Sequence, residues 1–199
     1  MTKKHDIIWL DRTESTNREA ARRILELDNL SVLSAHCQFS GRGQGDHVWL
    51  SEPGMNLTFS IVLKYNMPGS LEDSCLFPAF PANRQSLISD IAVASVLEFL
   101  RRHEIEGTLK LPNDILVNGK KICGILIEHS VRGTFLNSTI VGIGLNVNQR
   151  NFDVSIPDAT SIALIHDEKK DPARSGLDLH SCLEEFMEIF CRLCASSLA

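Results

Sequence analysis

The stretch at residues 110–128, KLPNDILVNGKKICGILIE, decides the fold at the centre of this chain. Two apolar runs in it flank the pair Asn118-Gly119. A type I′ turn needs a positive φ at both central residues, and Asn followed by Gly tolerates this best. The stretch therefore predicts a β-hairpin with Asn118-Gly119 as its two-residue loop.

Opposite charges stand on the two strands of this hairpin. The loop pairs Leu116 with Lys121 and Asp114 with Cys123. Because side chains alternate along a strand and paired residues share a face, Asp114 and Lys121 lie on one face, on a diagonal of roughly 7–8 Å. We expect the two charged groups to stand too far apart for a forced contact. They would instead hold something between them, such as a metal-bound phosphate or a substrate carboxylate.

Composition predicts one globular domain over residues 1–199, because 43% of the residues are hydrophobic and 23% are charged. The formal charge of −5 argues against a nucleic-acid partner held through its phosphates. No apolar run reaches the roughly 18 residues of a membrane span, and the N-terminus lacks a signal-type apolar core, so we expect a cytoplasmic protein without a membrane partner. Six scattered cysteines indicate buried, reduced thiols, and the lone CxxC at Cys191 and Cys194 indicates helix packing.

Periodicity predicts strands and helices in mixed order along the chain. A half-buried strand at 56–63 and a helix at 86–102 have the clearest patterns. A final amphipathic helix follows Asp178, which is a suitable cap. The other expected strands cover 7–10, 32–35 and 139–148, and the first helix covers 18–27.

Two hydroxyls precede the first expected helix. Thr16 and Glu19 fit a capping box, which satisfies free N–H groups without any ligand. In the other interpretation, Ser15 and Thr16 bind a small polar ligand at the positive end of the helix.

The stretch from Gln38 to Trp49 contains a glycine-rich loop, GRGQG, at residues 41–45. It is either a mobile surface loop or a cradle for an anion, and Arg42 favours the anion. Trp49 either packs on the core or stacks on a ring-bearing ligand. Further along, the strand at 139–148 contains Gly142 and Gly144, which indicate close approach by another group. Asn146 and Asn148 in that strand either need buried partners or mark a strand end that turns into solvent.

Taken in order, these motifs resemble those of a biotin protein ligase. They are Ser15-Thr16-Asn17, Gln38 with GRGQG and Trp49, KLPND, Lys121 with CGILIE, and GIGLNVN, and they extend over roughly residues 6–165. The resemblance implies an α+β fold in which helices flank a mixed, largely antiparallel central sheet, similar to the core of class II aminoacyl-tRNA synthetases. It implies that ATP and Mg²⁺ activate biotin as biotinyl-5′-AMP. The biotinyl group then passes to a lysine of a biotin carboxyl carrier domain, with a homodimer as a possible assembly.

The resemblance also implies roles for individual residues. Lys121 and Arg42 are the expected catalytic groups, and Asp114 is expected near the magnesium. Biotin is expected to contact Ser15, Thr16, Gln38, Gly41, Arg42, Gly43, Lys121, Gly124, Ile125 and Leu126. The nucleotide is expected to contact Arg42, Gln44, Trp49, Asn113 and Asn146.

This chain also departs from the family pattern. Leu111 replaces the usual Trp, and we expect it to pack in the core. We expect no N-terminal winged helix, hence no DNA-binding role, and no small C-terminal β domain, because the chain ends in a predicted helix. Two alternatives follow: a relative that binds biotin or its adenylate with weak transfer, and a lipoate or octanoate transferase of the same fold. The KLPND box and the GILIE strand argue against the second alternative.

Overall fold

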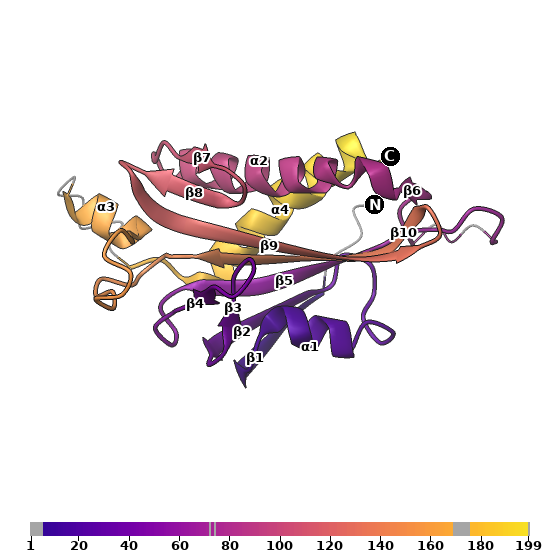
Figure 1. Ribbon diagram of the computed structural model, residues 1–199. Helices are drawn as coiled ribbons and strands as arrows, with labels where there is room; N and C mark the ends of the chain where they lie inside the picture. Colours follow the sequence, from indigo (N-terminus) through magenta and orange to yellow (C-terminus); the bar gives the residue numbers. More distant parts are fainter. Residues whose placement is uncertain (1–5, 72, 74, 169–175, 199) are drawn as a thin grey trace.

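The computed structural model describes residues 6–71, 73, 75–168 and 176–198. Its main sheet contains β1 (Ile7–Thr13), β2 (Val32–Gln38), β5 (Leu57–Lys64), β6 (Phe80–Pro81), β7 (Thr108–Lys110), β8 (Asp114–Val117), β9 (Lys120–Arg132) and β10 (Phe135–Leu145). The strand order is β1-β2-β5-β10-β9-β8-β7, with β6 paired to β10 (Figure 1). Only β1 and β2 pair in parallel among these strands. The predicted mixed, largely antiparallel sheet is confirmed.

The helices are α1 (Thr16–Arg22), η1 (Ala82–Arg84), α2 (Ser86–Arg102), α3 (Ile162–Glu168) and α4 (Leu179–Ser197). The bounds of α2 match the prediction, whereas α1 begins earlier and is shorter than expected. The cap of α4 is also as predicted, because Asp178 Oδ2 accepts a hydrogen bond from the Ser181 N–H at 2.8 Å.

Helices cover the two faces of the sheet unequally. On one face, α2 and α4 lie side by side and bury the main hydrophobic core (Figure 1). On the other face, α1 covers only part of the surface, above a smaller core that contains Ala20, Leu33, Val62 and Ile140. The face beside α1 is therefore available for a site.

Strand β5 corrects one prediction. We expected residues 56–63 to form a half-buried strand, but Leu57–Leu63 are all buried. The core covers Leu57, Phe59, Ile61 and Leu63 on one side. On the other side, Val62 lies under α1, and Thr58 and Ser60 are buried by hydrogen-bonded neighbours. Polar alternation here marks a buried polar surface.

The central hairpin has the predicted loop but a different register. Asn118 and Gly119 have φ values of 51° and 79°, and Leu116 pairs with Lys121 as expected. The predicted pairing of Asp114 with Cys123 is wrong, because the register shifts and Asp114 pairs with Gly124. The shift gives β9 one extra residue, a β-bulge, so that Ile122 and Cys123 both reach the main core. Gly124 is thereby placed on the face that carries Lys121.

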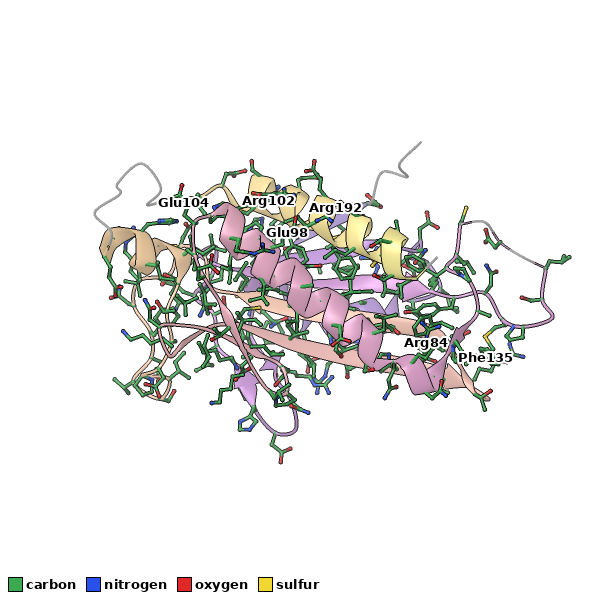
Figure 2. The ribbon with its side chains drawn as sticks, turned by 90° about the horizontal axis from the view of Figure 1, so that it is seen from above. Arg84, Glu98, Arg102, Glu104, Phe135 and Arg192 are labelled. Carbon is green, nitrogen blue, oxygen red and sulfur yellow. The ribbon has the colours of Figure 1, made fainter. Side chains whose placement is uncertain are left out.

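Surface ion pairs join the two helices above the sheet. Figure 2, seen from above, shows Glu98 and Arg102 on α2 beside Arg192 on α4. Arg192 Nη2 donates to Glu98 Oε1 at 2.6 Å, and this hydrogen bond holds the pKa of the Glu98 carboxyl below its usual value. Because the group is exposed, the ion pair adds little to stability.

All six cysteines are free thiols, as predicted. Their predicted burial is confirmed for Cys123, Cys182 and Cys194, is partial for Cys37 and Cys191, and is wrong for the exposed Cys75. Among the described residues, no helix is both long and apolar enough to cross a membrane.

Candidate active site

A pocket of about 460 Å³ opens on the sheet face beside α1. Most of the predicted site residues line it: Ser15, Thr16, Gln38, Arg42, Gly43, Gln44, Trp49, Asn113, Asp114, Lys121, Gly124, Ile125 and Leu126. Asn146 lines an adjoining hollow of about 300 Å³, which also contacts Lys121 and Asp114. The fold thus brings residues from well-separated motifs to one place.

The floor of the pocket is made by small residues on the central strands. Gly144 of β10 pairs with Thr58 on one side and Gly124 on the other, and Gly142 pairs with Ser60 and Leu126. A Cβ at Gly142 would lie 2.2 Å from Asn17 Oδ1, and a Cβ at Gly144 would lie 2.3 Å from Trp49 Cε2. The predicted close approach at both glycines is confirmed, and the approaching groups are protein side chains.

Trp49 lies inside the pocket and is not part of the main core. It belongs to a two-stranded ribbon of β3 (Gly41–Arg42) and β4 (Val48–Trp49) that stands over the sheet. Its ring contacts the backbone at Gly144 and Gly124, and Lys121 Nζ is 5.5 Å from the ring centroid. Its buried Nε1 has no hydrogen-bond partner among the described residues. Of the two interpretations of Trp49, this position favours contact with a ligand.

The start of α1 is hydrogen-bonded to Gln38, and both line the pocket. The Thr16 N–H donates to Gln38 Oε1 at 2.9 Å, and Ser15 is the N-cap residue but makes no capping hydrogen bond through its side chain. The predicted capping box of Thr16 with Glu19 is therefore wrong, because a side chain from β2 satisfies the free N–H group. The Ser15 hydroxyl caps no N–H group, the Thr16 hydroxyl contacts Ser60 Oγ at 2.8 Å, and both residues line the pocket.

Asp114 and Lys121 form an ion pair across the hairpin, with 2.6 Å between Asp114 Oδ1 and Lys121 Nζ. The expectation that they stand apart is wrong in this structure. The β-bulge keeps both on one face while the side chains, with 23% and 38% of their surfaces exposed, bend toward one another. Together they place a cation and an anion at the junction of the pocket and the adjoining hollow.

Arg42 and Glu128 form a second ion pair at the pocket wall, with 3.0 Å between Nη1 and Oε1. The other carboxylate oxygen of Glu128 accepts from Asn17 Nδ2 at 2.8 Å. Asn17 also donates to the Leu126 carbonyl at 3.2 Å and accepts from Ser60 Oγ at 2.6 Å. Ser60 was not predicted as a site residue, and Asn17 and Glu128 were predicted only as parts of motifs. The signal that could have identified Ser60 is a polar residue on a buried strand.

Three residues singled out in the sequence have surroundings that differ from the expectation. Asn113 uses its amide on the Ile125 carbonyl, at 2.8 Å, and so holds the loop before β8. Gly41 is not among the described residues that line the pocket. A Cβ there would lie 2.4 Å from the Trp49 carbonyl oxygen, so the lack of a side chain at Gly41 lets β3 and β4 pair. Leu111 was expected in the core, but it is 78% exposed at the pocket mouth, so that expectation is wrong.

The two asparagines at the end of β10 have buried partners rather than solvent. Asn146 Nδ2 donates to the Thr160 carbonyl at 2.9 Å, whereas its buried Oδ1 has no partner among the described residues. Asn148 exchanges two hydrogen bonds with the backbone of Leu177. Asn146 therefore keeps one unused acceptor beside the adjoining hollow, and Asn148 is structural.

Comparison with protein families agrees with this geometry. The model of the biotin/lipoate A/B protein ligase family matches residues 9–146, which include every predicted site residue. The chain belongs to this family.

Curated members of the family are similar over most of the chain. The bifunctional ligase/repressor BirA of Bacillus subtilis is 33% identical over 183 residues, which are 90% of this chain and 50% of that protein. The biotin–[acetyl-CoA-carboxylase] ligase of Paracoccus denitrificans is 32% identical over 138 residues, 69% of this chain and 53% of that protein. The chain thus spans about half the length of these relatives.

A solved structure of a family member confirms the fold. The biotin protein ligase from Aquifex aeolicus in complex with biotin and ATP superposes with a TM-score of 0.71 at 27% identity, covering 97% of this chain and 72% of that one. The predicted resemblance to biotin protein ligases is therefore confirmed in sequence and in fold.

Proposed function

We propose that this protein activates biotin with ATP to give biotinyl-5′-AMP and transfers the biotinyl group to a lysine of a biotin carboxyl carrier domain. The observation that carries the proposal is one pocket that joins uncharged polar groups at one end to the Asp114–Lys121 pair at the other. Biotin has the same division, with a neutral ureido ring and a carboxylate. The relatives named as biotin ligases support this choice of substrate.

The polar end of the pocket suits the ureido group. Ser15, Thr16 and Gln38 surround this end with hydroxyl and amide groups. A ureido group offers N–H donors and a carbonyl acceptor, so it can use both kinds of partner. Gly124, Ile125 and Leu126 would form the apolar wall beside the ring system. Gly43 of the ribbon loop would cover it from above.

The charged end of the pocket suits adenylation. In that step a carboxylate oxygen of biotin forms a bond to the α-phosphorus of ATP, and the bond to the pyrophosphate oxygen breaks. Two anions must approach, so a cation between them lowers the barrier. Lys121 would hold the biotin carboxylate beside the α-phosphate. Arg42, paired with Glu128 at the pocket wall, would add a second positive charge near the phosphates.

Magnesium fits the acidic side of this site only with help from the nucleotide. Asp114 is the carboxylate at the junction, and no group of three metal-ligating side chains occurs among the described residues. Mg²⁺ commonly binds through one or two carboxylates together with substrate phosphates. Asp114 would supply that carboxylate, and the bound ion would neutralise charge that develops on pyrophosphate.

The adjoining hollow would take the nucleotide. Asn146 lines this hollow and has a buried oxygen without a partner among the described residues, and an adenine amino group is a suitable donor for it. Trp49 would offer a ring for stacking, and Gln44 would contact the phosphates or ribose from the loop. Asn113 would act by holding the loop before β8. In the second step a lysine nitrogen forms a bond to the biotinyl carbon while AMP leaves.

Two alternatives have different substrates or outcomes. The family model covers lipoate as well as biotin ligases. The dithiolane ring of lipoate carries no hydrogen-bonding group that would use Ser15, Thr16 and Gln38, so the polar end of the pocket favours biotin. A relative that binds biotin or its adenylate with weak transfer has the same pocket, and only an assay separates it.

The test is incubation of the protein with ATP, Mg²⁺, biotin and a biotin carboxyl carrier domain. Pyrophosphate release reports activation, and a streptavidin blot of the carrier reports transfer. Lys121→Ala is expected to abolish pyrophosphate release with an unchanged circular dichroism spectrum, while Glu98→Gln, which alters an ion pair on the far side of the sheet, is the control. Tight biotin binding without transfer would favour the binding relative, and transfer of lipoate instead would refute the proposal.

The remaining expectations stay predictions. The free thiols support a reducing compartment such as the cytoplasm. The formal charge of −5 supports the absence of a DNA partner. The expected homodimer would be tested by measuring the mass of the protein in solution.

A further inference from the structure

A chain of hydrogen bonds leads from the pocket wall to the polar end of the pocket. Arg42 Nη1 and Asn17 Nδ2 each contact one oxygen of Glu128, at 3.0 and 2.8 Å. Asn17 Oδ1 contacts Ser60 Oγ at 2.6 Å, and Ser60 Oγ contacts Thr16 Oγ1 at 2.8 Å. Thr16, Asn17 and Ser60 are 4%, 3% and 0% exposed, so the chain is shielded from water.

The direction of each hydrogen bond in this chain follows from counting protons, starting at Glu128. Its carboxylate can only accept, and so can the Leu126 carbonyl, so the group of Asn17 that faces both is the NH₂ group. The Asn17 oxygen must then face Ser60. Because an amide oxygen cannot donate, the single hydroxyl proton of Ser60 is given to Asn17.

The same counting of protons applies to Thr16, which lines the pocket. Ser60 has used its proton, so its contact with Thr16 forms only if Thr16 donates. Thr16 is then unable to give the same proton to Gln38 Oε1, which is farther away at 3.3 Å and already accepts from the Thr16 N–H at 2.9 Å. The Thr16 hydroxyl is left with a free lone pair and no free proton. Toward the pocket it acts as an acceptor.

We propose that Glu128 is a positioning residue that, together with the Leu126 carbonyl, fixes the direction of this hydrogen-bond chain and thereby makes Thr16 an acceptor for an N–H group of the ligand. The inference rests on the proposed function, in which that N–H belongs to the ureido group of biotin. Glu128 does not touch the ligand; it acts through Asn17, Ser60 and Thr16. It would make the polar end selective for a donor and disfavour an analogue that presents only acceptors there.

The decisive experiment exchanges the acid and the amide between two positions. In Glu128→Gln, the new amide cannot accept from both Arg42 and Asn17, so one contact fails. In Asn17→Asp, two carboxylates face one another. In the double variant, the glutamine introduced at position 128 can accept from Arg42 and donate to the aspartate introduced at position 17. That aspartate still accepts from Ser60, so the original direction returns, but its second oxygen replaces the donor at the Leu126 carbonyl, and that hydrogen bond becomes an unfavourable contact between two acceptors.

Biotin affinity is measured by titration calorimetry on the full chain. We expect Glu128→Gln to weaken binding by at least about tenfold, because a hydrogen bond to a charged group is replaced by an unfavourable contact. The double variant is expected to bind at least about fivefold more tightly than Asn17→Asp, since the direction of the chain is restored and the two opposed carboxylates are removed. Glu98→Gln, the same substitution in an arginine pair of α2 and α4, is the matched control and is expected to bind like the wild type.

A second readout keeps the inference testable if Glu128→Gln fails to fold. In Asn17→Asp, a proton shared between the two carboxylates preserves the direction of the chain, and neighbouring carboxylates raise one pKa. Its affinity for biotin is expected to fall between about pH 5.5 and pH 8, because that proton is lost, while wild-type affinity stays constant.

The outcomes separate this inference from the proposed function. Wild-type protein that binds no biotin overturns both. Wild-type binding together with a Glu128→Gln variant that binds within about twofold overturns only the role of Glu128. A double variant that binds no more tightly than Asn17→Asp, or a pH-independent Asn17→Asp variant, also overturns it, because a merely structural role predicts no rescue and no pH dependence.

Discussion

The substitution Gly142→Ala is expected to destabilise this protein by displacing one side chain. Gly142 lies at the middle of the sheet, between Ser60 and Leu126, and Asn17 occupies the space where its Cβ would be. The distances from that Cβ to Oδ1, Cγ and Nδ2 of Asn17 would be 2.2, 2.9 and 3.0 Å. Carbon and oxygen atoms normally approach only to about 3.3 Å, so the side chain must withdraw by about 1 Å.

The magnitude follows from the bonds that Asn17 would lose. Its contacts at 2.6 Å to Ser60 and 3.2 Å to the Leu126 carbonyl are between neutral groups, worth about 0.5–1.5 kcal/mol each. The contact at 2.8 Å to Glu128 involves a charge, worth about 1.5–3 kcal/mol. Replacing Gly by Ala returns about 0.4–1 kcal/mol through the unfolded chain. The free energy of unfolding should fall by about 2–5 kcal/mol.

Urea denaturation followed by circular dichroism measures this change. Gly124→Ala is the matched control, because its Cβ would meet only side-chain atoms of Trp49 and Lys121, at 3.1 Å or more. That variant is expected to remain within about 1 kcal/mol of wild type. In an Asn17→Ala background the clash is removed, so the cost of Gly142→Ala should also drop below about 1 kcal/mol. If Gly142→Ala alone costs less than that, Asn17 is not held as argued and the reasoning is refuted.

Three further predictions concern the charged end, the thiols and a helix cap. Asp114→Asn should reduce pyrophosphate release by about 100-fold or more while calorimetry shows biotin affinity within about threefold, and unchanged release would contradict its proposed role. Ellman's reagent should modify one thiol of the native protein in the first phase, because only Cys75 is exposed and burial raises the pKa of Cys182 to about 12; Cys75→Ser should remove that phase. The Asp178→Ala variant should be less stable to urea at neutral pH, since hydrogen bonds from Ser181 lower the pKa of Asp178. A lowered folded-state pKa gives stability that is present above the unfolded value and lost as pH falls through the folded one, so the two proteins should converge below about pH 4.

Elements governed by local rules could be predicted from the sequence. Helix α2 has a regular apolar stripe, α4 follows a residue whose carboxylate caps it, and the Asn118-Gly119 loop needs a backbone that few other pairs adopt. Each signal lies within a few residues of the structure that it produces. These elements matched because no distant segment had to intervene.

Contacts between distant segments account for the errors. The capping box at Thr16 failed because Gln38, 22 positions away, supplies the partner. The hydrogen bond from Asn17 to Glu128 joins residues 111 positions apart, and no local pattern around either residue indicates it. The register of β9 was not predicted because residues far along the chain hold the bulge at Ile122. The Lys121 N–H donates to the Asp158 carbonyl, and the Thr160 N–H donates to the Lys121 carbonyl.

Strand β10 explains why a fold and a site could be inferred from the same residues. Its side chains alternate between Val141, Ile143 and Leu145, which fill the core under α2 and α4, and two glycines on the opposite face. Apolar bulk is required on the core face, whereas any side chain on the other face would strike Asn17 or Trp49. Glycine in a buried strand normally destabilises it, so contacts made in the space where the side chains would be must offset this cost. In this protein, Asn17 and Trp49, which shape the pocket, occupy that space. A pattern unfavourable for a strand therefore indicated the position of the site.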